Sequence, residues 1–355
     1  MTVESPLTGH LHALAPVEVH AGRLGIAVDP RLELMAVVQL ISDYPARWPT
    51  MTRLDFEYRR EVEAAFGGHG EHAAVRFLNE LLARPFSVEA PPFAFSGPVD
   101  FALHLDAAGR LHPWVAERPL LLQRVGGAEA LHQFAALLDR FRADTRFAAF
   151  YEAHIPFYRQ LVHDTAETAG VDGDLDEIER FFGTTKRAYT AVLVPLYGTV
   201  GFGPSVGPLG TPEEAVYSVT GPEQLVDGRP TFGSHTYFTY LKRHEFSHSF
   251  VNPMVDRQWE RVARYDQFAR IGDAMRARSY GEWRDAVYEH IVRAATTWFA
   301  YGDSPETGDD ALEAEMDRGF IFVAPLLEKI RVYETERDRY PTLKSYFGEL
   351  VKAFA

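Results

Sequence analysis

Residues 244–248 read His-Glu-Phe-Ser-His, and this short stretch governs the interpretation of the whole chain. His244 and His248 are four residues apart, so on an α-helix both imidazoles project from one face, one turn from each other. Two imidazoles at that spacing can share a tetrahedral zinc ion. Glu245 lies about 100° around the helix from His244, beside the metal position. The stretch therefore predicts a zinc site flanked by a free carboxylate.

The carboxylate of Glu245 has the place of a general base. It can accept a proton from a water activated by the metal and pass it to a leaving amine. The pattern H-E-x-x-H on a helix is typical of metallopeptidases. We therefore expect Glu245 to be catalytic, His244 and His248 to bind Zn²⁺, and a peptide or protein to be the substrate.

A catalytic zinc site needs a third protein ligand and an open position. Glu289 is the strongest candidate, since Arg293 follows it by one helical turn and can hold its carboxylate in place. His290 and Asp256 are the alternatives for the ligand. Asp285 is a further candidate for a residue that supports the ligands. The alternative interpretation of these residues is a solvated, acidic helix face, on which Glu289 and Arg293 form an ordinary ion pair between positions four apart.

The surroundings of the motif predict a small sheet followed by helices. Residues 189–196 are expected to form a buried strand, residues 198–210 a glycine-rich loop, and residues 214–220 a second strand at an edge. The metal helix is expected over residues 235–251, with Asn252-Pro253 as its end. An extended peptide would then pair with the strand at 214–220.

The rest of the chain reads as mainly helical. The expected elements are a tail at 1–15, a strand at 17–28, helices at 31–42, 52–66, 71–84 and 174–183, two helices within 127–170, short strands at 93–95 and 100–105, and helices at 257–279, 282–300, 308–336 and 342–354. The predicted fold class is α+β and mostly helical. Residues 1–185 would form a helical scaffold, and residues 186–355 a zincin-like catalytic domain.

The run from His244 to Pro253, together with Glu289-His-Ile-Val-Arg-Ala294, resembles a bacterial family recorded as a domain of unknown function. Residues 28–34, Val-Asp-Pro-Arg-Leu-Glu-Leu, resemble the start of that family. Its members are regarded as zinc peptidases of the gluzincin type, in which two histidines lie on one helix and a glutamate comes from a following helix. The resemblance implies His244, His248 and Glu289 as ligands and Glu245 as base. Many gluzincins have an acidic residue where this chain has Arg293, so the groups around the ligands must differ.

Composition excludes several other classes. The 355 residues carry a formal net charge of −14, which does not favour nucleic acid or anionic membranes. There is no cysteine, so disulfides and thiolate metal sites are excluded. We expect no membrane span and see no signal peptide, which predicts a soluble, cytoplasmic protein with export left open. The oligomeric state is not predicted.

Two other functions compete with hydrolysis at a zinc site. A non-catalytic scaffold could bind zinc and turn over nothing, although such a site has no need of Glu245. A serine hydrolase could use Ser205, because residues 203–207 match G-x-S-x-G, yet no helix is expected directly after this serine. Tyr237 and Tyr240 precede the motif and are candidates for oxyanion stabilisation, with a core role as the alternative.

Overall fold

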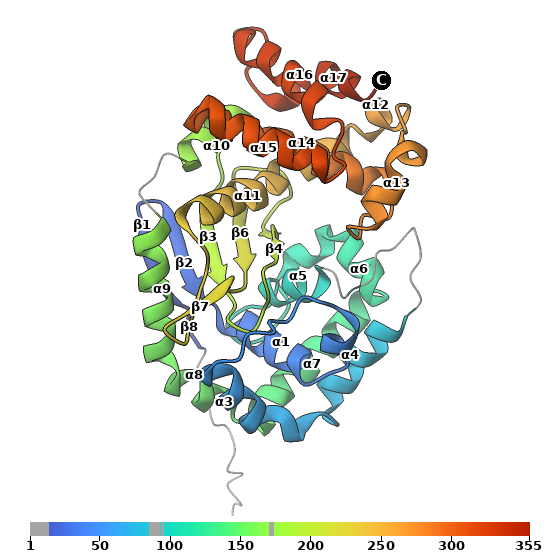
Figure 1. The fold of residues 1–355 in the computed structure, drawn as a ribbon. Helices are drawn as coiled ribbons and strands as arrows, with labels where there is room; N and C mark the ends of the chain where they lie inside the picture. The colour runs from blue at the N-terminus through green and yellow to red at the C-terminus, as the bar shows by residue number, and fades with distance from the viewer. Residues whose placement is uncertain (1–13, 85–92, 94–95, 170–173) are drawn as a thin grey trace, which may run out of the picture.

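The computed structural model describes residues 14–84, 93, 96–169 and 174–355 and is shown in Figure 1. The fold is α+β and mostly helical, as predicted, with one six-stranded mixed sheet and a separate two-stranded hairpin. The strands are β1 (Val17–Ala21), β2 (Leu24–Val28), β3 (Ala188–Leu193), β4 (Gly201–Phe202), β5 (Ser205–Val206), β6 (Ala215–Thr220), β7 (Gln224–Val226) and β8 (Arg229–Thr231).

The helices fall into an N-terminal and a C-terminal group on either side of β3 to β8. The N-terminal helices are α1 (Pro30–Leu40), α2 (Tyr44–Arg47), α3 (Glu57–Phe66), η1 (Gly67–His69), α4 (Ala73–Ala83), α5 (Gly97–Leu103), η2 (Pro113–Glu117), α6 (Pro119–Val125), α7 (Ala128–Asp144), α8 (Phe147–Ala153), α9 (Ile155–Ala169) and α10 (Asp174–Phe182). The C-terminal helices are α11 (His235–Arg257), α12 (Trp259–Ala263), α13 (Phe268–Arg276), α14 (Trp283–Asp303), α15 (Pro305–Asp317), α16 (Val323–Thr335), α17 (Leu343–Leu350) and η3 (Val351–Phe354).

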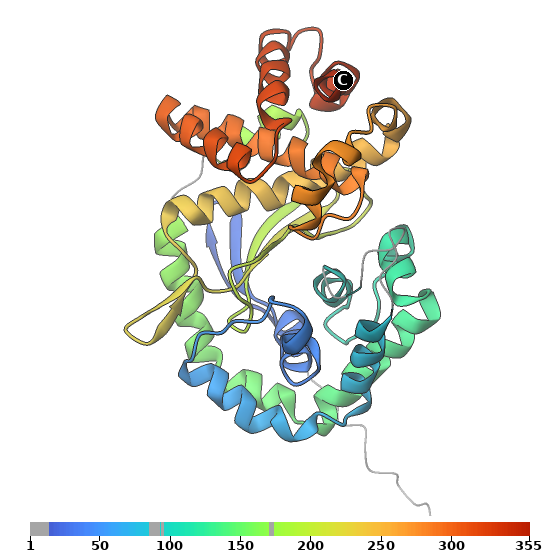
Figure 2. The same ribbon diagram turned by 45° about the vertical axis from the view of Figure 1, so that its right-hand side comes forward.

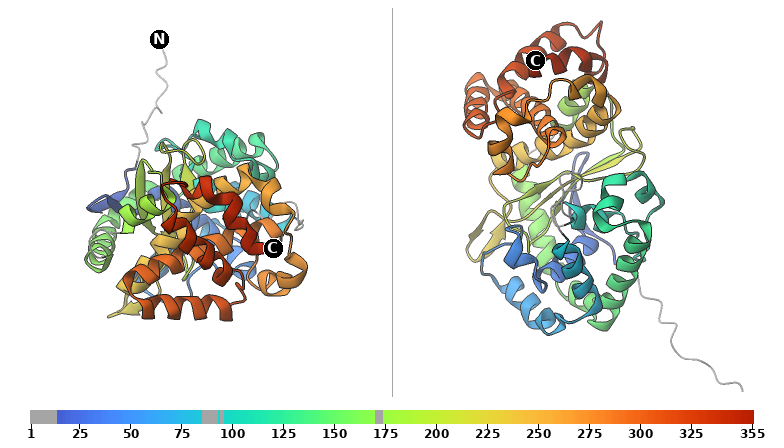
Figure 3. Two further views of the ribbon diagram at one scale, coloured as in Figure 1. Left: turned by 90° about the horizontal axis from the view of Figure 1, so that it is seen from above. Right: turned by 90° about the vertical axis from the view of Figure 1, so that its right-hand side faces the viewer.

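The sheet lies between these two groups of helices. Figure 3 shows the C-terminal helices at one end of the molecule and most of the N-terminal helices at the other. Helix α11 packs on β6 and α9 packs on β1 and β2. The strand order is β1-β2-β3-β6-β4, with β5 also paired to β6. Strands β2, β3 and β6 run parallel, while β1, β4 and β5 are antiparallel to their neighbours.

Strands from the N-terminal end and from the middle of the chain share this sheet. Residues 17–28 form the hairpin β1–β2 and not one strand, because Gly22 adopts a positive φ of 59° and reverses the chain. β2 then pairs with β3 from Leu24 opposite Tyr189 to Ala27 opposite Val192. The division expected at residue 185 therefore runs through the sheet, and the first part contributes two strands to it.

Strand β6 is an inner strand, so its prediction as an edge was wrong. It pairs with β3 on one side and with β4 and β5 on the other. The glycine-rich loop contains these two short strands, and their pairing takes up the hydrogen-bonding groups that an added peptide would need. A peptide strand therefore cannot pair along residues 214–220, and the outer edge beside β6 belongs to β4 and β5.

Helix α11, which was expected over residues 235–251, continues beyond its expected end. α11 runs to Arg257 with Pro253 inside it. A proline has no N–H, so the carbonyl of Ser249, four residues earlier, loses its helical partner. The ammonium of Lys186 donates to that carbonyl oxygen at 3.0 Å and takes over the missing bond. The sequence could not show this compensation, because the donor is 67 residues from the proline.

Several other element predictions also need correction. Residues 100–105 belong largely to helix α5, the stretch 127–170 holds three helices, and both 257–279 and 308–336 hold two. Arg146 (φ 55°) separates α7 from α8, and Gly319 (φ 89°) lies between α15 and α16. A single left-handed residue ends a helix without breaking the apolar periodicity around it. Of the strand expected at 93–95, residues 94 and 95 lie outside the described residues.

A continuous apolar core connects the sheet with both groups of helices. Leu24, Ile26 and Val28 of β2 and Phe246 of α11 are almost fully buried in it. Hairpin β7–β8 projects from the side of the molecule (Figure 2). Within the described part of the chain, no helix is both long and apolar enough to cross a membrane.

Candidate metal centre

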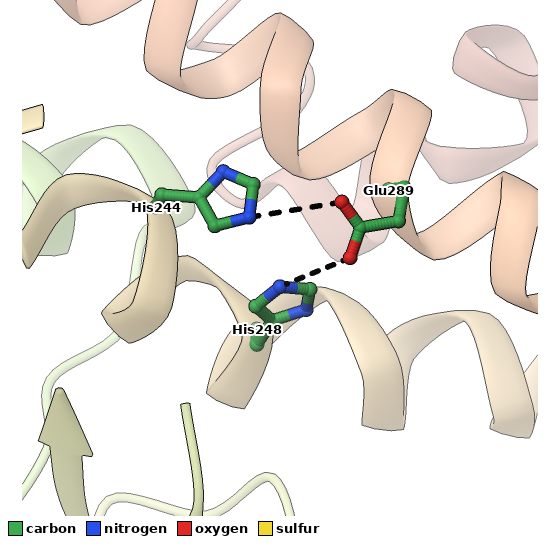
Figure 4. A group of neighbouring side chains, drawn as sticks. All are labelled: His244, His248 and Glu289. Atoms are coloured by element: carbon green, nitrogen blue, oxygen red, sulfur yellow. Dashed lines mark ion pairs between the residues drawn. The ribbon is translucent and has the colours of Figure 1, made fainter. Parts of the chain in front are cut away.

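His244, His248 and Glu289 meet where α11 crosses α14 (Figure 4). The Nε2 atom of His244 lies 3.7 Å from Oε2 of Glu289, and the Nε2 atom of His248 lies 3.5 Å from Oε1. One ligand atom from each of the three residues lies within 4.8 Å of the other two. All three side chains are at most 14% exposed, so the donors converge in a nearly buried position.

The packing of α11 against α14 explains this convergence. On α11, Phe246 is fully buried and lies about 160° around the helix from His248, so the two histidines project from the opposite face, toward α14. On α14, Val287, Ile291 and Ala294 are fully buried. These three residues lie on the side of α14 opposite to Glu289, about 140–160° around the helix from it. Glu289 is thereby held facing α11, although it lies 41 residues after His248.

The donor set fits a zinc ion. Zinc prefers imidazole nitrogen and carboxylate oxygen at about 2.0–2.1 Å in a tetrahedron, which separates neighbouring ligand atoms by about 3.4 Å. The nitrogen–oxygen distances of 3.5 and 3.7 Å are close to that value, and each ends on a different oxygen of the Glu289 carboxylate. The residues present therefore fit the metal that the motif predicts.

The second nitrogen of each histidine has a different environment. Nδ1 of His248 lies 3.2 Å from Oδ1 of Asn252, so it can donate there and leave Nε2 free for a metal. Nδ1 of His244 is buried and has no hydrogen-bond partner among the described residues, while the ring of Tyr240 stacks on the imidazole. Burial lowers the pKa of His244 well below its usual range, which keeps the imidazole neutral.

Arg293 holds the carboxylate of Glu289, as the spacing of four residues predicts. Its Nη2 lies 3.0 Å from Oε2 of Glu289, and its Nη1 lies 2.8 Å from Oε2 of the buried Glu315. Burial alone would raise the pKa of Glu289, but the neighbouring charge of Arg293 lowers it to about 2. Glu289 is therefore ionised and available as a ligand at neutral pH.

Glu245 lies beside the three donors and against Gly201 of β4 and Gly203 of the β4–β5 loop. A Cβ atom added to Gly201 would lie 2.2 Å from Oε1 of Glu245, and one added to Gly203 would lie 2.3 Å from its backbone oxygen. Only glycine permits this approach of the loop to the helix. Burial, followed by the charge of Glu289, raises the pKa of Glu245 to about 8. A carboxylate with a raised pKa can hold a proton near neutral pH.

The alternative third ligands lie elsewhere. His290 is fully buried on another face of α14, where its Nδ1 approaches the backbone oxygen of Ala286 at 2.6 Å. Asp256 is half exposed and bonds to Tyr288 and Arg284. Neither belongs to the group of converging donors. Asp285 lies one turn before Glu289, and burial with the charge of Glu282 raises its pKa to about 6.

The environment of Ser205 does not resemble that of a nucleophile. It lies on β5, it is buried, and its hydroxyl donates to Glu214 at 2.5 Å. The chain continues from there toward β6, so no helix starts at this serine. The hydroxyl of Tyr240 donates to Glu315 at 3.1 Å, and Tyr237 is partly buried.

Three residues near the site were not foreseen. Asn252 had a readable signal, since it lies four residues after His248 on the same helix. Glu315 had none, because α15 approaches Arg293 only through tertiary packing. Tyr280 precedes α14, and its hydroxyl lies 3.5 Å from Nη2 of Arg293 and helps to lower the pKa of Glu289.

Comparison with known proteins gives a family and no characterised relative. No curated protein matches the chain, and no solved structure does. One family model, described as a domain of unknown function (DUF4932), matches residues 24–353. The match runs from β2 to η3 and includes His244, Glu245, His248 and Glu289. Because it covers almost the whole sequence, the chain belongs to the DUF4932 family of domains of unknown function.

Proposed function

We propose that this protein is a zinc-dependent peptidase of the gluzincin type. His244, His248 and Glu289 would bind the metal, and Glu245 would act as the general base. The observation that carries the proposal is the convergence of three donors from two helices, at 3.5 and 3.7 Å, with Glu245 buried beside them. The sheet, α11 and α14 would form a zincin-like catalytic unit, with residues 1–185 as its scaffold.

A zinc ion bound by these residues would polarise a scissile carbonyl and acidify a water molecule. The protein's own part is to hold and move the proton. Glu245 makes no ion pair among the described residues, and its raised pKa suits a group that accepts a proton and then releases it to an amine. Arg293 keeps Glu289 ionised, and Asn252 orients His248.

A zinc-binding scaffold without activity is the second candidate. Structural zinc sites have four protein ligands, whereas catalytic sites keep one position open. The described residues bring three donors together at this place. Three protein donors leave the fourth position of a tetrahedral ion to water or substrate, and this donor number and the neighbouring carboxylate favour the enzyme over the scaffold.

Metal analysis of the untagged protein tests the site. We expect about one zinc per chain in the wild type and loss of zinc in His248→Ala and Glu289→Ala. Loss in His248→Ala alone would mean that the third ligand is another residue. A folded wild type that binds no added zinc would end the proposal.

Hydrolysis of a peptide library tests the reaction. Glu245→Gln should retain zinc and lose at least about 100-fold in turnover, because the general base is absent. Equal turnover in the variant and the wild type would show that Glu245 is not the base. A fluorophosphonate probe, which labels active serines, should leave the protein unmodified.

A further inference from the structure

The buried carboxylate of Glu214 joins β5 and the loop between β5 and β6 to the start of β6. Glu214 is fully buried, directly before β6. Its oxygens accept hydrogen bonds from Ser205 Oγ at 2.5 Å, from the backbone N–H of Gly210 at 2.9 Å and from the ammonium of Lys186 at 2.5 Å. Arg118 lies 3.7 Å away and donates to the backbone oxygen of Ser205 at 2.6 Å. The loop between β5 and β6 is therefore fixed from three sides.

Lys186 connects this carboxylate to the metal helix. Its ammonium, 1% exposed, bonds both to Glu214 and to the backbone oxygen of Ser249. Ser249 follows His248 directly, and its carbonyl lacks a helical donor because Pro253 has no N–H. Lys186 therefore stabilises the turn of α11 that carries His248 and Asn252.

Gly201 and Gly203 are in close contact with Glu245 of helix α11. Gly201 and Gly203 are so close to Glu245 that a single added carbon would overlap it. A small shift of the loop, or of the helix turn, would change the environment of that carboxylate. The ion pair between Lys186 and Glu214 is bonded to both partners of this contact. Lys186 bonds to α11, and Glu214 bonds to the segment that follows Gly203.

We infer that Lys186 and Glu214 form a positioning pair. The pair fixes the position of helix α11 relative to residues 201–210, whose Gly201 and Gly203 lie against Glu245. Neither residue is one of the metal donors, so they act through other groups. A buried ion pair adds little net stability compared with apolar side chains of similar size, and its fixed geometry is what such a pair provides. The inference concerns the geometry of the centre and goes beyond the proposed reaction.

Four variants of the full chain test the inference: Lys186→Met, Lys186→Arg, Glu214→Gln and the control Lys242→Met. Lys242 is also a buried lysine of an ion pair, 3.0 Å from Asp174, and it belongs to α11 itself. Two measurements are made on each: the zinc dissociation constant, by competition with a chelator, and hydrogen exchange of backbone amides over 198–213 and 249–257.

We expect Lys186→Met and Glu214→Gln to raise the zinc dissociation constant about 10-fold, the effect of losing a group that supports a ligand. Exchange should accelerate in both segments together, even though only one segment contacts the substituted side chain directly in each case. Lys186→Arg keeps a cationic donor, so it should show a smaller increase than Lys186→Met in both the zinc dissociation constant and the exchange rate of the two segments. In Lys242→Met, the zinc dissociation constant and the exchange rates of both segments should stay within about twofold of the wild-type values.

Wild-type zinc affinity together with unchanged exchange in Lys186→Met and Glu214→Gln would overturn the inference. Uniformly faster exchange along the whole chain would also overturn it, since that is the result for a merely structural ion pair. If the wild type binds no zinc, the peptidase proposal fails by itself, and coupled exchange of the two segments still decides the positioning role. If Lys186→Met does not fold, the near-isosteric Glu214→Gln carries the test.

Discussion

Glu33 is a carboxylate whose environment opposes its charge. It is fully buried on α1, and Tyr58 donates its hydroxyl to one carboxylate oxygen. The other oxygen is buried without a partner among the described residues. Burial raises the pKa of Glu33 to about 8, despite the opposing hydrogen bond from Tyr58. The folded protein therefore holds a proton on Glu33 at pH 7 that the unfolded chain releases.

The contribution of Glu33 to the free energy of unfolding should consequently fall as the pH rises from 4.5, the ordinary value, to about 8. In that window the unfolded state loses the proton and the folded state keeps it, so each pH unit favours unfolding by about 1.4 kcal/mol. Glu33→Gln should remove about 2 kcal/mol of this loss between pH 5 and pH 7, as measured by urea denaturation. The exposed Glu152→Gln is the control. Parallel pH profiles for Glu33→Gln and wild type would contradict the prediction.

A substitution at Gly201 tests the contact between β4 and Glu245, the proposed base. In Gly201→Ala the new carbon would lie 2.2 Å from Oε1 of Glu245 and 2.7 Å from Leu241, so the carboxylate must move. We expect at least about 10-fold lower peptide turnover with zinc content unchanged, because the base shifts and the ligands do not. Gly198→Ala is the matched control, since its nearest neighbour would be 3.4 Å away. Equal turnover in both variants would show that the approach of Gly201 to Glu245 is not needed.

At the scale of the element, α11 supplies both histidines and the residue that orients one of them. Asn252 is four residues after His248, a spacing that only a helix continuing past residue 251 can use. Asn252→Ala should weaken zinc binding about 10-fold while the helix content stays unchanged, because Nδ1 of His248 loses its acceptor. Chelator competition and circular dichroism measure the two quantities. Gln258→Ala, at the end of the same helix, should bind zinc as the wild type does; a similar loss there would mean that the helix end matters and the amide does not.

At the scale of the whole molecule, the sheet combines strands from residues 17–28 with strands from residues 188–220. β2 covers one edge of β3, and its Leu24, Ile26 and Val28 are buried. Residues 186–355 expressed alone should therefore aggregate or lack a cooperative thermal transition, because that edge of β3 and its apolar side chains become exposed. Size-exclusion chromatography and calorimetry test this, with co-expressed residues 1–185 as the control that should restore solubility. A monomeric, cooperatively folding fragment 186–355 would show that the boundary at residue 185 separates two independent domains.

The sequence alone was sufficient where a feature depends on neighbours along one helix. The shared face of His244 and His248, and the pairing of Glu289 with Arg293, follow from the helical repeat of 3.6 residues. The mostly helical α+β class follows from the periodicity of apolar residues in the same way. Each of these needs only local geometry, which the order of residues fixes.

Only the tertiary structure decided which distant groups meet. Glu289 and its neighbour His290 differ by about 100° on one helix, and the packing of α14 on α11 selects Glu289. Local signals predicted a helix end at Pro253, but Lys186 bonds to the carbonyl that the proline leaves without a donor, and α11 continues. Local signals also predicted a sheet edge at β6, but β4 and β5 pair with its outer side. The physical reason is the same in each case: a proline, a strand edge or a carboxylate acquires its role from a partner that the folding of the whole chain brings to it.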